Sequence, residues 1–503
     1  MAGRGLVSGS RQDERSSGEL VRRVDGGEAG TFPGQRQGPE PVTAGTSPRG
    51  LLRISINDNL LCSRLLYIFA IMDTEKFKNF ILEHENDDPA RLLLSRGKWK
   101  DIDTGLAVNT VISRKKLKGK VPEWYAEAGL IFPSSLSAEQ CSSQTTAEYK
   151  ARLARRLYQE TLRGSTGNTG KADSGGMRIA DLTGGLGVDS RAFSKTAEHV
   201  LYNEMNPLLA DAAAHNFRLL GADNITVSCK ALEPGSLEGI LGGADTAGRE
   251  ENCQDTGFCP DIIYLDPARR DDAGKKVFLL EDCRPDILKL KEELLAKARF
   301  VIVKLSPMAD ISMVTDRLGE HCREIHIVSS GGECKELLAV LDREYSGECV
   351  TVAACNAGKD NAVFTFCPSE EKYASAEFPA SQDEVMSAGF LFEPDKALMK
   401  SGAFNLISER FHITKLSRNT HLYIFNAPEA AAGLSGYGKV YTILKVFPMN
   451  KAGIRQAASE FQEAEVTARN IHMSSEQLRK RLGVRSGDRI HIFGAEYLIV
   501  TER

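Results

Sequence analysis

The stretch RIADLTGGLGVDS, residues 178–190, places three glycines directly after a short apolar segment that ends in an aspartate. Glycine weakens a helix or a strand, so a cluster of glycines usually marks a turn that something approaches closely. The apolar residues before the turn predict a strand, and the residues after it predict the start of a helix. Such a turn lies at the carboxyl end of the first strand, where open α/β sheets bind their ligands.

Short apolar segments continue to alternate with helical patterns on the carboxyl side of this turn. Strands are expected at HVLYNE, ITVSC, DIIYLD, FVIVKLS and EIHIVSS, and helices at PLLADAAAHNFRLLG, RPDILKLKEELLAKA and ISMVTDRLGEHC. This alternation predicts an α/β, Rossmann-like parallel sheet with helices on both faces. Residues 235–259 are expected to form a surface insertion, and CVTVAAC with AVFTF is expected to form a hairpin.

A length of 503 residues suggests about three domains. Helical patterning over 72–163 supports an N-terminal helical region, in which Ser137 and Gln140 match a capping box and Leu92, Leu93 and Leu94 supply an apolar face. The expected parts are 1–71, a disordered extension or a start-site artefact with Met72 as the true start; 72–163, the helical region; 164–368, the Rossmann-like domain; and two small α+β units, 386–428 and 436–503.

The composition excludes several classes of protein. The formal net charge of −4 means that any face that binds nucleic acid must be local. The eleven cysteines show no CxxC pair and no zinc-type spacing, which favours a reduced, cytoplasmic protein without a metal, with a catalytic cysteine as the lesser alternative. No apolar run is long enough to cross a membrane, since the nearest, 60–72, is short and contains Arg64.

The glycine turn favours one kind of cofactor. Asp181, Gly185 and Gly187 fit D-x-x-x-G-x-G, but Ser190 stands where a dinucleotide motif has its third glycine. This pattern suits a ligand with an amino acid moiety better than a pyrophosphate. Glu204 ends the second strand, where a carboxylate can accept both ribose hydroxyls. A carboxylate at this position also binds the ribose of NAD, and the glycines alone could form a plain tight turn. Together, the glycines, Asp181 and Glu204 predict a nucleoside-bearing cofactor.

The fourth strand ends in a second motif, Asp266–Pro267–Ala268–Arg269. It corresponds to the D/N-P-P-Y/F/W position of methyltransferases that act on exocyclic amines. A carboxylate oxygen and a main-chain carbonyl can accept the two amine hydrogens and orient the nitrogen toward an S-methyl group. Arg269 replaces the usual aromatic residue, and a guanidinium plane can also stack on a base. The alternative is an ordinary turn at the end of a strand.

Four motifs in order, DLTGGLGVDS, LDPARRD, VKLSPMADIS and ECKELLAVLD, resemble a bacterial family of class I S-adenosylmethionine-dependent methyltransferases with a THUMP-like C-terminal domain. EQCSSQTTAEYK matches that family's N-terminal segment. FEPDKALMKSGAF with KLSRNTHLY matches its small ferredoxin-like domain, and VFPMNK with the segment 467–493 matches its THUMP-like domain. The resemblance runs from Met72 to the end. The core is also similar to trimethylguanosine-synthase-type enzymes, which methylate guanine N2.

The resemblance implies S-adenosylmethionine as the cofactor, RNA as the partner because THUMP domains bind RNA, and transfer of a methyl group to an exocyclic base amine. It places the cofactor at Asp181, Thr183, Gly184, Gly185, Gly187, Asp189 and Glu204. The target amine would meet Asp266, Pro267, Ala268 and Arg269. Substrate contacts would come from Gln140, Ser142, Lys304, Ser306, Pro307, Arg469 and Arg481.

Several alternatives stay open at this point. Lys230 stands where the family tends to carry an acid that binds adenine, and a backbone amide could take over that contact. Lys304 is either a phosphate ligand or a cation at the sheet edge, and Gln140 with Ser142 forms either a lid or a capped surface helix. The other candidate functions are a non-catalytic RNA-binding adaptor and a methyltransferase for a protein or a small molecule. No oligomeric state follows from the sequence.

Overall fold

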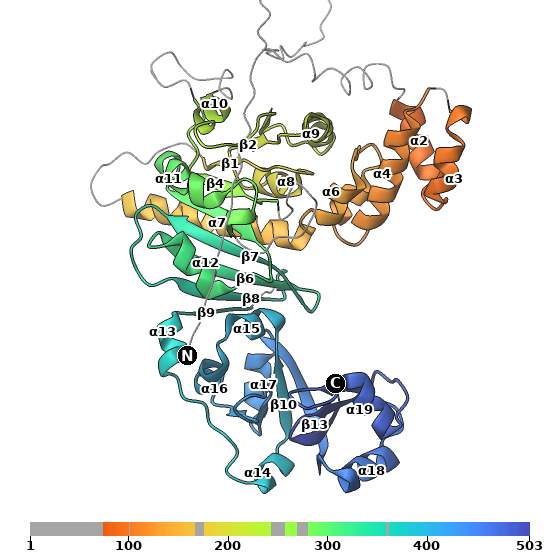
Figure 1. Ribbon diagram of the computed structural model, residues 1–503, viewed down its shortest axis with the longest axis vertical. Coiled ribbons are helices and arrows are strands. Elements are labelled where there is room, and N and C mark those ends of the chain that lie inside the picture. The colour runs from red at the N-terminus through yellow and green to blue at the C-terminus, as the bar shows by residue number, and fades with distance from the viewer. Residues whose placement is uncertain are drawn as a thin grey trace, which may run out of the picture. The chain divides into compact units, whose positions relative to one another are not determined.

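The computed structural model describes residues 74–99, 101–165, 176–242, 257–268, 280–358 and 362–502 (Figure 1). All described residues belong to one compact unit, which lies within Asn59–Arg503. The predicted extension 1–71, with the alternative start at Met72, therefore lies outside the described residues.

The N-terminal part is helical, as predicted. Its elements are α2 (Thr74–Glu83), α3 (Pro89–Leu94), η1 (Arg96–Lys98), α4 (Thr104–Leu117), α5 (Pro122–Ala126), α6 (Ser135–Gln140) and α7 (Gln144–Ser165). Of the three leucines in α3, Leu92 is buried, whereas 47% of Leu93 and 88% of Leu94 are exposed. The prediction that all three pack was wrong, because three consecutive helical residues point in different directions.

The predicted capping box was placed one turn too late. Ser134 caps α6 and accepts a hydrogen bond from the amide of Ser137. The helix ends at Gln140, and a corner at Cys141–Ser143 separates it from α7. Sequence pattern favours one helix here, but Ser142 turns inward and is buried, which interrupts it.

The first sheet has nine strands in the order β3-β2-β1-β4-β5-β7-β6-β8-β9. Their bounds are β1 (Arg178–Asp181), β2 (His199–Asn203), β3 (Ile225–Ser228), β4 (Ile262–Leu265), β5 (Phe300–Leu305), β6 (Cys322–Ser330), β7 (Glu333–Asp342), β8 (Val350–Cys355) and β9 (Ala362–Phe366). Strands β3, β2, β1, β4 and β5 are parallel, as predicted.

The rest of the sheet is mixed, a feature that the predicted alternation of strands and helices does not include. ECKELLAVLD forms β7, which lies antiparallel between β5 and β6. Gly331 and Gly332 both have positive φ and allow the chain to reverse tightly between β6 and β7. The expected hairpin is β8 with β9, and it extends this same sheet.

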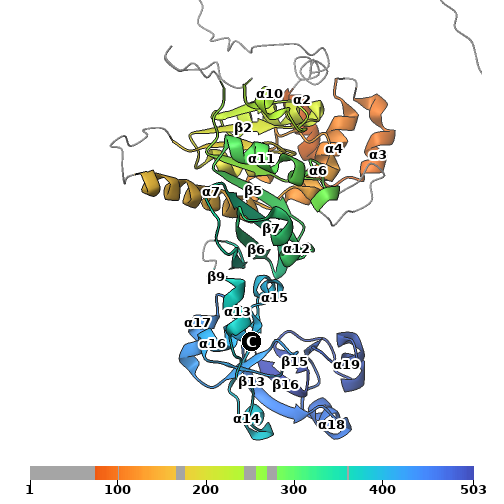
Figure 2. The same ribbon diagram turned by 60° about the vertical axis from the view of Figure 1, so that its left-hand side comes forward.

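Helices cover both faces of the sheet, as predicted. The remaining helical elements of this region are α8 (Val188–Ser194), α9 (Pro207–Leu219), α10 (Leu237–Gly242), η2 (Leu280–Asp282), α11 (Ile287–Lys297) and α12 (Ile311–Leu318). On β4, Ile263 packs in a core with Leu290 of α11, whereas Ile262 packs in a core with Leu153 of α7. Helix α7 thus covers the sheet and is part of this domain's core (Figures 1 and 2).

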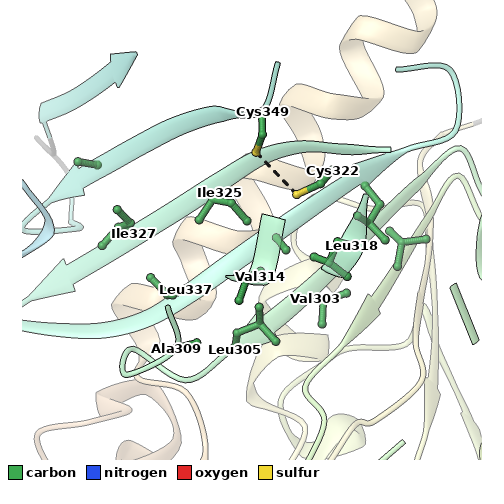
Figure 3. Close-up of a cluster of buried hydrophobic side chains, with 14 of the residues drawn as sticks. Val303, Leu305, Ala309, Val314, Leu318, Cys322, Ile325, Ile327, Leu337 and Cys349 are labelled. Atoms are coloured by element: carbon green, nitrogen blue, oxygen red, sulfur yellow. Dashed lines mark hydrogen bonds between the residues drawn. The ribbon is translucent and has the colours of Figure 1, made fainter. Parts of the chain in front are cut away.

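The core under α12 is shown in Figure 3. Val303 of β5, Ile325 of β6 and Leu318 of α12 are fully or almost fully buried there. Cys322 and Cys349 face each other in the same core, with their Sγ atoms 3.7 Å apart. This packing fixes β5, whose carboxyl end reaches the candidate site.

The second sheet has seven strands in the order β11-β12-β10-β13-β16-β15-β14. Its strands are β10 (Phe390–Pro394), β11 (Thr414–Lys415), β12 (Tyr423–Phe425), β13 (Gly438–Pro448), β14 (Glu465–Ala468), β15 (Ile490–Gly494) and β16 (Tyr497–Glu502). The helices are α13 (Pro368–Tyr373), α14 (Gln382–Met386), α15 (Lys396–Ser401), α16 (Phe404–Phe411), α17 (Pro428–Leu434), α18 (Lys451–Glu460) and α19 (Ser475–Leu482). The two predicted α+β units share this sheet, because β10 pairs with β13.

Candidate active site

The glycine turn after β1 is compact because its glycines touch neighbouring side chains. A Cβ on Gly184 would lie 2.1 Å from Tyr202, and a Cβ on Gly187 would lie 2.6 Å from Phe217. Gly187 also has φ +91° and Gly185 has φ +53°, values that favour glycine. A Cβ on Gly185 would meet only a main-chain oxygen at 3.9 Å, so the backbone stays bare on that side.

Asp181 braces this turn from inside. Its carboxyl is 1% exposed and accepts hydrogen bonds from the Ser190 hydroxyl and, at 3.2 Å, from the amide of Thr183. Burial raises the pKa of Asp181 to about 8. The hydrogen bond from Ser190 lowers this pKa, whereas the neighbouring Asp189 carboxylate raises it further. The side chain is therefore mostly protonated at neutral pH.

Glu204 lies at the end of β2 and faces the same turn. Its Oε2 accepts a hydrogen bond from the amide of Gly185 at 2.9 Å, and its Oε1 accepts one from the amide of Asn206 at 2.8 Å. The side chain is half-buried, in contrast to Asp181. Lys230 follows β3, is exposed, and donates its amide to Asn203 at 3.1 Å.

The tip of β4 meets the glycine turn directly. The amide of Asp266 donates a hydrogen bond of 2.6 Å to the Thr183 hydroxyl. Pro267 is buried and Ala268 is exposed, and Ala268 pairs with Arg284 through two backbone hydrogen bonds of 2.7 and 3.1 Å. Arg269 lies outside the described residues. The two predicted motifs are thus in contact.

The tip of β5 contributes Lys304, whose Nζ lies 2.7 Å from Asp266 Oδ2. Ser306 is buried, and its hydroxyl accepts a hydrogen bond from the amide of Met308 at 3.2 Å. Pro307 is half-buried beside it. Lys304 therefore faces the carboxylate at the neighbouring strand tip.

Behind these tips lies a group of polar side chains that we call the buried charge cluster: Ser142, Lys150, Asp189, Lys304 and Glu336. All five are buried, and the Lys150 side chain is 0% exposed. Lys150 Nζ lies 2.8 Å from Glu336, 2.9 Å from the Ser142 hydroxyl and 3.1 Å from Asp189. The cluster joins α7, the corner before it, α8, β5 and β7.

The Asp189 carboxylate is a buried anion of the cluster that accepts hydrogen bonds from two hydroxyl groups. These are the Ser142 hydroxyl at 2.8 Å and the Tyr264 hydroxyl at 2.9 Å. Burial alone would raise the pKa of Asp189, but the ammonium groups of Lys150 and Lys304 outweigh it and hold the pKa below its usual value. Asp189 therefore stays ionised although it is buried.

Sequence reasoning found Ser142, Asp189 and Lys304 but missed Lys150, Glu336 and Tyr264. A signal for Lys150 was present, because it falls on the apolar face of α7 with Ala147 and Ala154 at helical spacing. Glu336 gives a weaker signal, because it directly precedes the apolar residues 337–341 of β7 and is buried with them. An isolated charge on a buried face needs a partner, and this pattern points to a cluster without naming its members.

The other predicted substrate residues have other surroundings. Gln140 is exposed at the end of α6. Arg469 follows β14 and its guanidinium pairs with Glu393 of β10. Arg481 is exposed in the last turn of α19. Within the described part of the chain, none of these three forms a hydrogen bond or an ion pair with the buried charge cluster.

The described ranges contain neither a membrane-spanning helix nor a metal-binding group of side chains. None of their helices is long and apolar enough to cross a membrane. Within the same residues, no group of three or more His, Cys, Asp or Glu side chains could hold a metal ion.

Comparison with known proteins agrees with these domains. Residues 390–430 match a family model described as a ferredoxin-like domain, and residues 438–503 match one described as THUMP domain-like. A search of curated proteins found no match.

One solved structure is similar over most of the chain. A protein from Porphyromonas gingivalis W83, provisionally assigned as a methyltransferase, is 26% identical with a TM-score of 0.69, covering 86% of this chain and 99% of that one. A SAM-dependent methyltransferase from Agrobacterium tumefaciens is 16% identical with a TM-score of 0.24, covering 38% and 62%, too little to carry an argument. The predicted resemblance is confirmed, since the chain combines a class I methyltransferase fold with C-terminal ferredoxin-like and THUMP-like domains.

Proposed function

We propose that this protein is an S-adenosylmethionine-dependent methyltransferase that modifies an exocyclic base amine of RNA, with chemistry like that at guanine N2. The observation that carries the proposal is the 2.6 Å hydrogen bond between the Asp266 amide and the Thr183 hydroxyl. It brings the candidate amine-binding motif against the candidate cofactor turn. A donor at one and an acceptor at the other would be within reacting distance.

The residues around the glycine turn fit S-adenosylmethionine. The backbone at Gly185 is bare on one side, and Glu204 keeps a half-buried carboxylate at the end of β2 for the ribose hydroxyls. Thr183, Gly184 and Gly187 would shape the turn around the methionine part, with Asp181 and Asp189 bracing it from behind. When bound, the cofactor supplies a methyl group on a positively charged sulfur, already activated for transfer.

The acceptor side needs only modest catalytic help. One third of the Asp266 side chain is exposed, so its carboxylate can accept one hydrogen of the amine while the Pro267 carbonyl accepts the other. The nitrogen then attacks in line with the carbon–sulfur bond. A carbon–nitrogen bond forms, the carbon–sulfur bond breaks, and the amine releases one proton to Asp266 or to water. The stacking role of Arg269 stays a prediction.

RNA is the proposed partner because of the C-terminal domain. The THUMP-like match over 438–503 and the exposed Arg481 support a contact with phosphates there. Arg469 would act less directly, since Glu393 already compensates its charge. A cytoplasmic location fits the nine cysteines with free thiols among the described residues.

The test incubates the purified chain with methyl-labelled S-adenosylmethionine and separate pools of RNA, protein and small metabolites from cells that lack the protein. Label is expected in the RNA pool, and digestion to nucleosides identifies the modified atom. Asp266→Ala should bind the cofactor by calorimetry but transfer no label. Label only in the protein or metabolite pool contradicts the RNA substrate, and a wild-type chain that does not bind the cofactor supports the adaptor function instead.

A further inference from the structure

The ammonium of Lys304 contacts the Asp266 carboxylate, with Nζ 2.7 Å from Oδ2. Only 10% of the Lys304 side chain is exposed, against 33% for Asp266. Asp266 therefore lies between an open side and a buried cation. A carboxylate has two oxygens in one plane, so holding Oδ2 on the buried side leaves Oδ1 for a ligand on the open side.

Lys304 is itself held from two other directions. Its Nζ donates to the Ser142 hydroxyl at 3.3 Å and lies 4.0 Å from Glu336 Oε2. Ser142 comes from the corner before α7 and Glu336 from the middle of β7, so three separate elements converge on one ammonium group. A lysine side chain with three donors and three anchors has little freedom to move.

Ser142 connects Lys304 to the rest of the buried charge cluster. Its hydroxyl donates to Asp189 at 2.8 Å and accepts from Lys150 at 2.9 Å as well as from Lys304. One donor and two acceptors are the full capacity of a hydroxyl. The position of Lys304 is thus coupled to Asp189 at the start of α8, next to the glycine turn.

Lys304 keeps its positive charge in the folded protein. Burial alone would lower its pKa, but the carboxylates of Asp266, Glu336 and Asp189 together outweigh burial and raise the pKa above its usual value. The ammonium is therefore present at every pH at which the protein would work. The hydrogen-bond donors of this ammonium group are already directed at carboxylates and a hydroxyl of the protein itself.

We propose that Lys304 is a positioning residue that fixes the Asp266 carboxylate for the acceptor amine, and that the N-terminal helical region takes part by holding Lys304 through Ser142. This proposal rests on the proposed function. It assigns Lys304 a role different from a phosphate ligand, because its ammonium points at the carboxylate it would orient. A small misplacement of such a group can cost about 100-fold in rate.

The test uses the full chain with Lys304→Ala, saturating labelled cofactor and RNA from cells that lack the protein. Transfer is expected to fall about 10- to 100-fold. Cofactor affinity by calorimetry should stay within about threefold, because Lys304 makes no direct hydrogen bond or ion pair with a residue assigned to the cofactor. Propylamine, which replaces the deleted atoms, should restore part of the rate as its concentration rises. Tetramethylammonium at the same ionic strength carries the charge but no N–H donor and should not.

The matched control is Lys291→Ala, a partly buried lysine of α11 whose Nζ donates to the Leu318 carbonyl at 3.1 Å. It should lose little activity and show no response to propylamine. If Lys304→Ala does not fold by circular dichroism, Lys304→Met keeps the side-chain volume, and the same loss of rate with retained cofactor affinity is then the expected result.

Four results overturn the proposal. The first is label transfer by Lys304→Ala within twofold of the wild-type rate, and the second is a loss of its cofactor affinity in parallel with rate. The third is a folded Lys304→Ala that does not recover activity with propylamine. The fourth is weaker retention of RNA on filters by the variant while its rate at saturating RNA is unchanged. The last would make Lys304 a phosphate ligand. Failure of the proposed function looks different, because the wild-type chain would then neither bind the cofactor nor transfer label, and the positioning role would fall with it.

Discussion

Lys150→Met tests the energetic weight of the buried charge cluster. The substitution keeps most of the side-chain volume but removes an ammonium that is 2.8 Å from Glu336 and 3.1 Å from Asp189. Both carboxylates are buried, with exposed side-chain fractions of 3% and 10%. Removing one partner of a buried pair costs about 3–5 kcal/mol, because the remaining charge has no water and no counter-ion.

The lower end of this range is expected here. Lys304 stays 4.0 Å from Glu336, and Ser142 and Tyr264 still donate to Asp189. A loss of about 3 kcal/mol in the free energy of unfolding corresponds to a fall in melting temperature of about 6–12 °C for a domain of 150–250 residues. The double variant Lys150→Met with Glu336→Gln removes both charges and should recover part of this loss.

The assay is thermal unfolding of the full chain followed by circular dichroism, with Lys291→Met as the control for loss of a partly buried lysine. The control should melt within about 2 °C of wild type, because its lysine contacts a carbonyl and a neighbouring surface carboxylate. The reasoning is refuted if Lys150→Met melts as high as the control, or if the double variant is less stable than Lys150→Met alone.

Three further predictions concern the turn and the C-terminal domain. Gly187→Ala should abolish cofactor binding by calorimetry, since its Cβ would meet Phe217 at 2.6 Å, whereas Gly221→Ala, at φ +64° with open space, should show only the backbone penalty in its melting temperature. Asp181→Asn should become more stable relative to wild type as pH rises from about 4 to 8, measured by urea unfolding. The raised pKa of about 8 means that the native carboxyl keeps its proton there while the unfolded one loses it, so wild-type stability falls with rising pH; equal pH dependence would contradict this. Arg481→Gln should make the plot of log RNA affinity against log salt concentration less steep by about one unit. An unchanged slope would exclude a phosphate contact.

The sequence was most informative where local pattern and position in the fold agree. The glycine turn and the meeting of Asp266 with that turn followed from the rule that carboxyl ends of parallel strands share one edge. The two small C-terminal domains were predicted from resemblance, and two family models match there.

The sequence was least informative where long-range pairing decides the structure. Strand β7 has an apolar pattern that does not reveal its direction or its place between β5 and β6. The partners of Lys150 lie 39 and 186 positions away in Asp189 and Glu336, a distance that no local pattern covers. The break before α7 also depends on Ser142 finding buried partners, which competes successfully with continued helix.

The continuous pairing of β10 with β13 has a practical consequence for the preparation of the THUMP-like end alone. A shortened chain that begins at residue 436 would keep its own THUMP-like match but strip a neighbour from β13 over five residue pairs, from Phe390–Thr442 to Pro394–Gly438. The exposed edge of β13 would then carry unpaired backbone amides and carbonyls, which promote aggregation by pairing with other chains. A truncated chain should therefore begin before Phe390, because the two C-terminal domains share one continuous sheet.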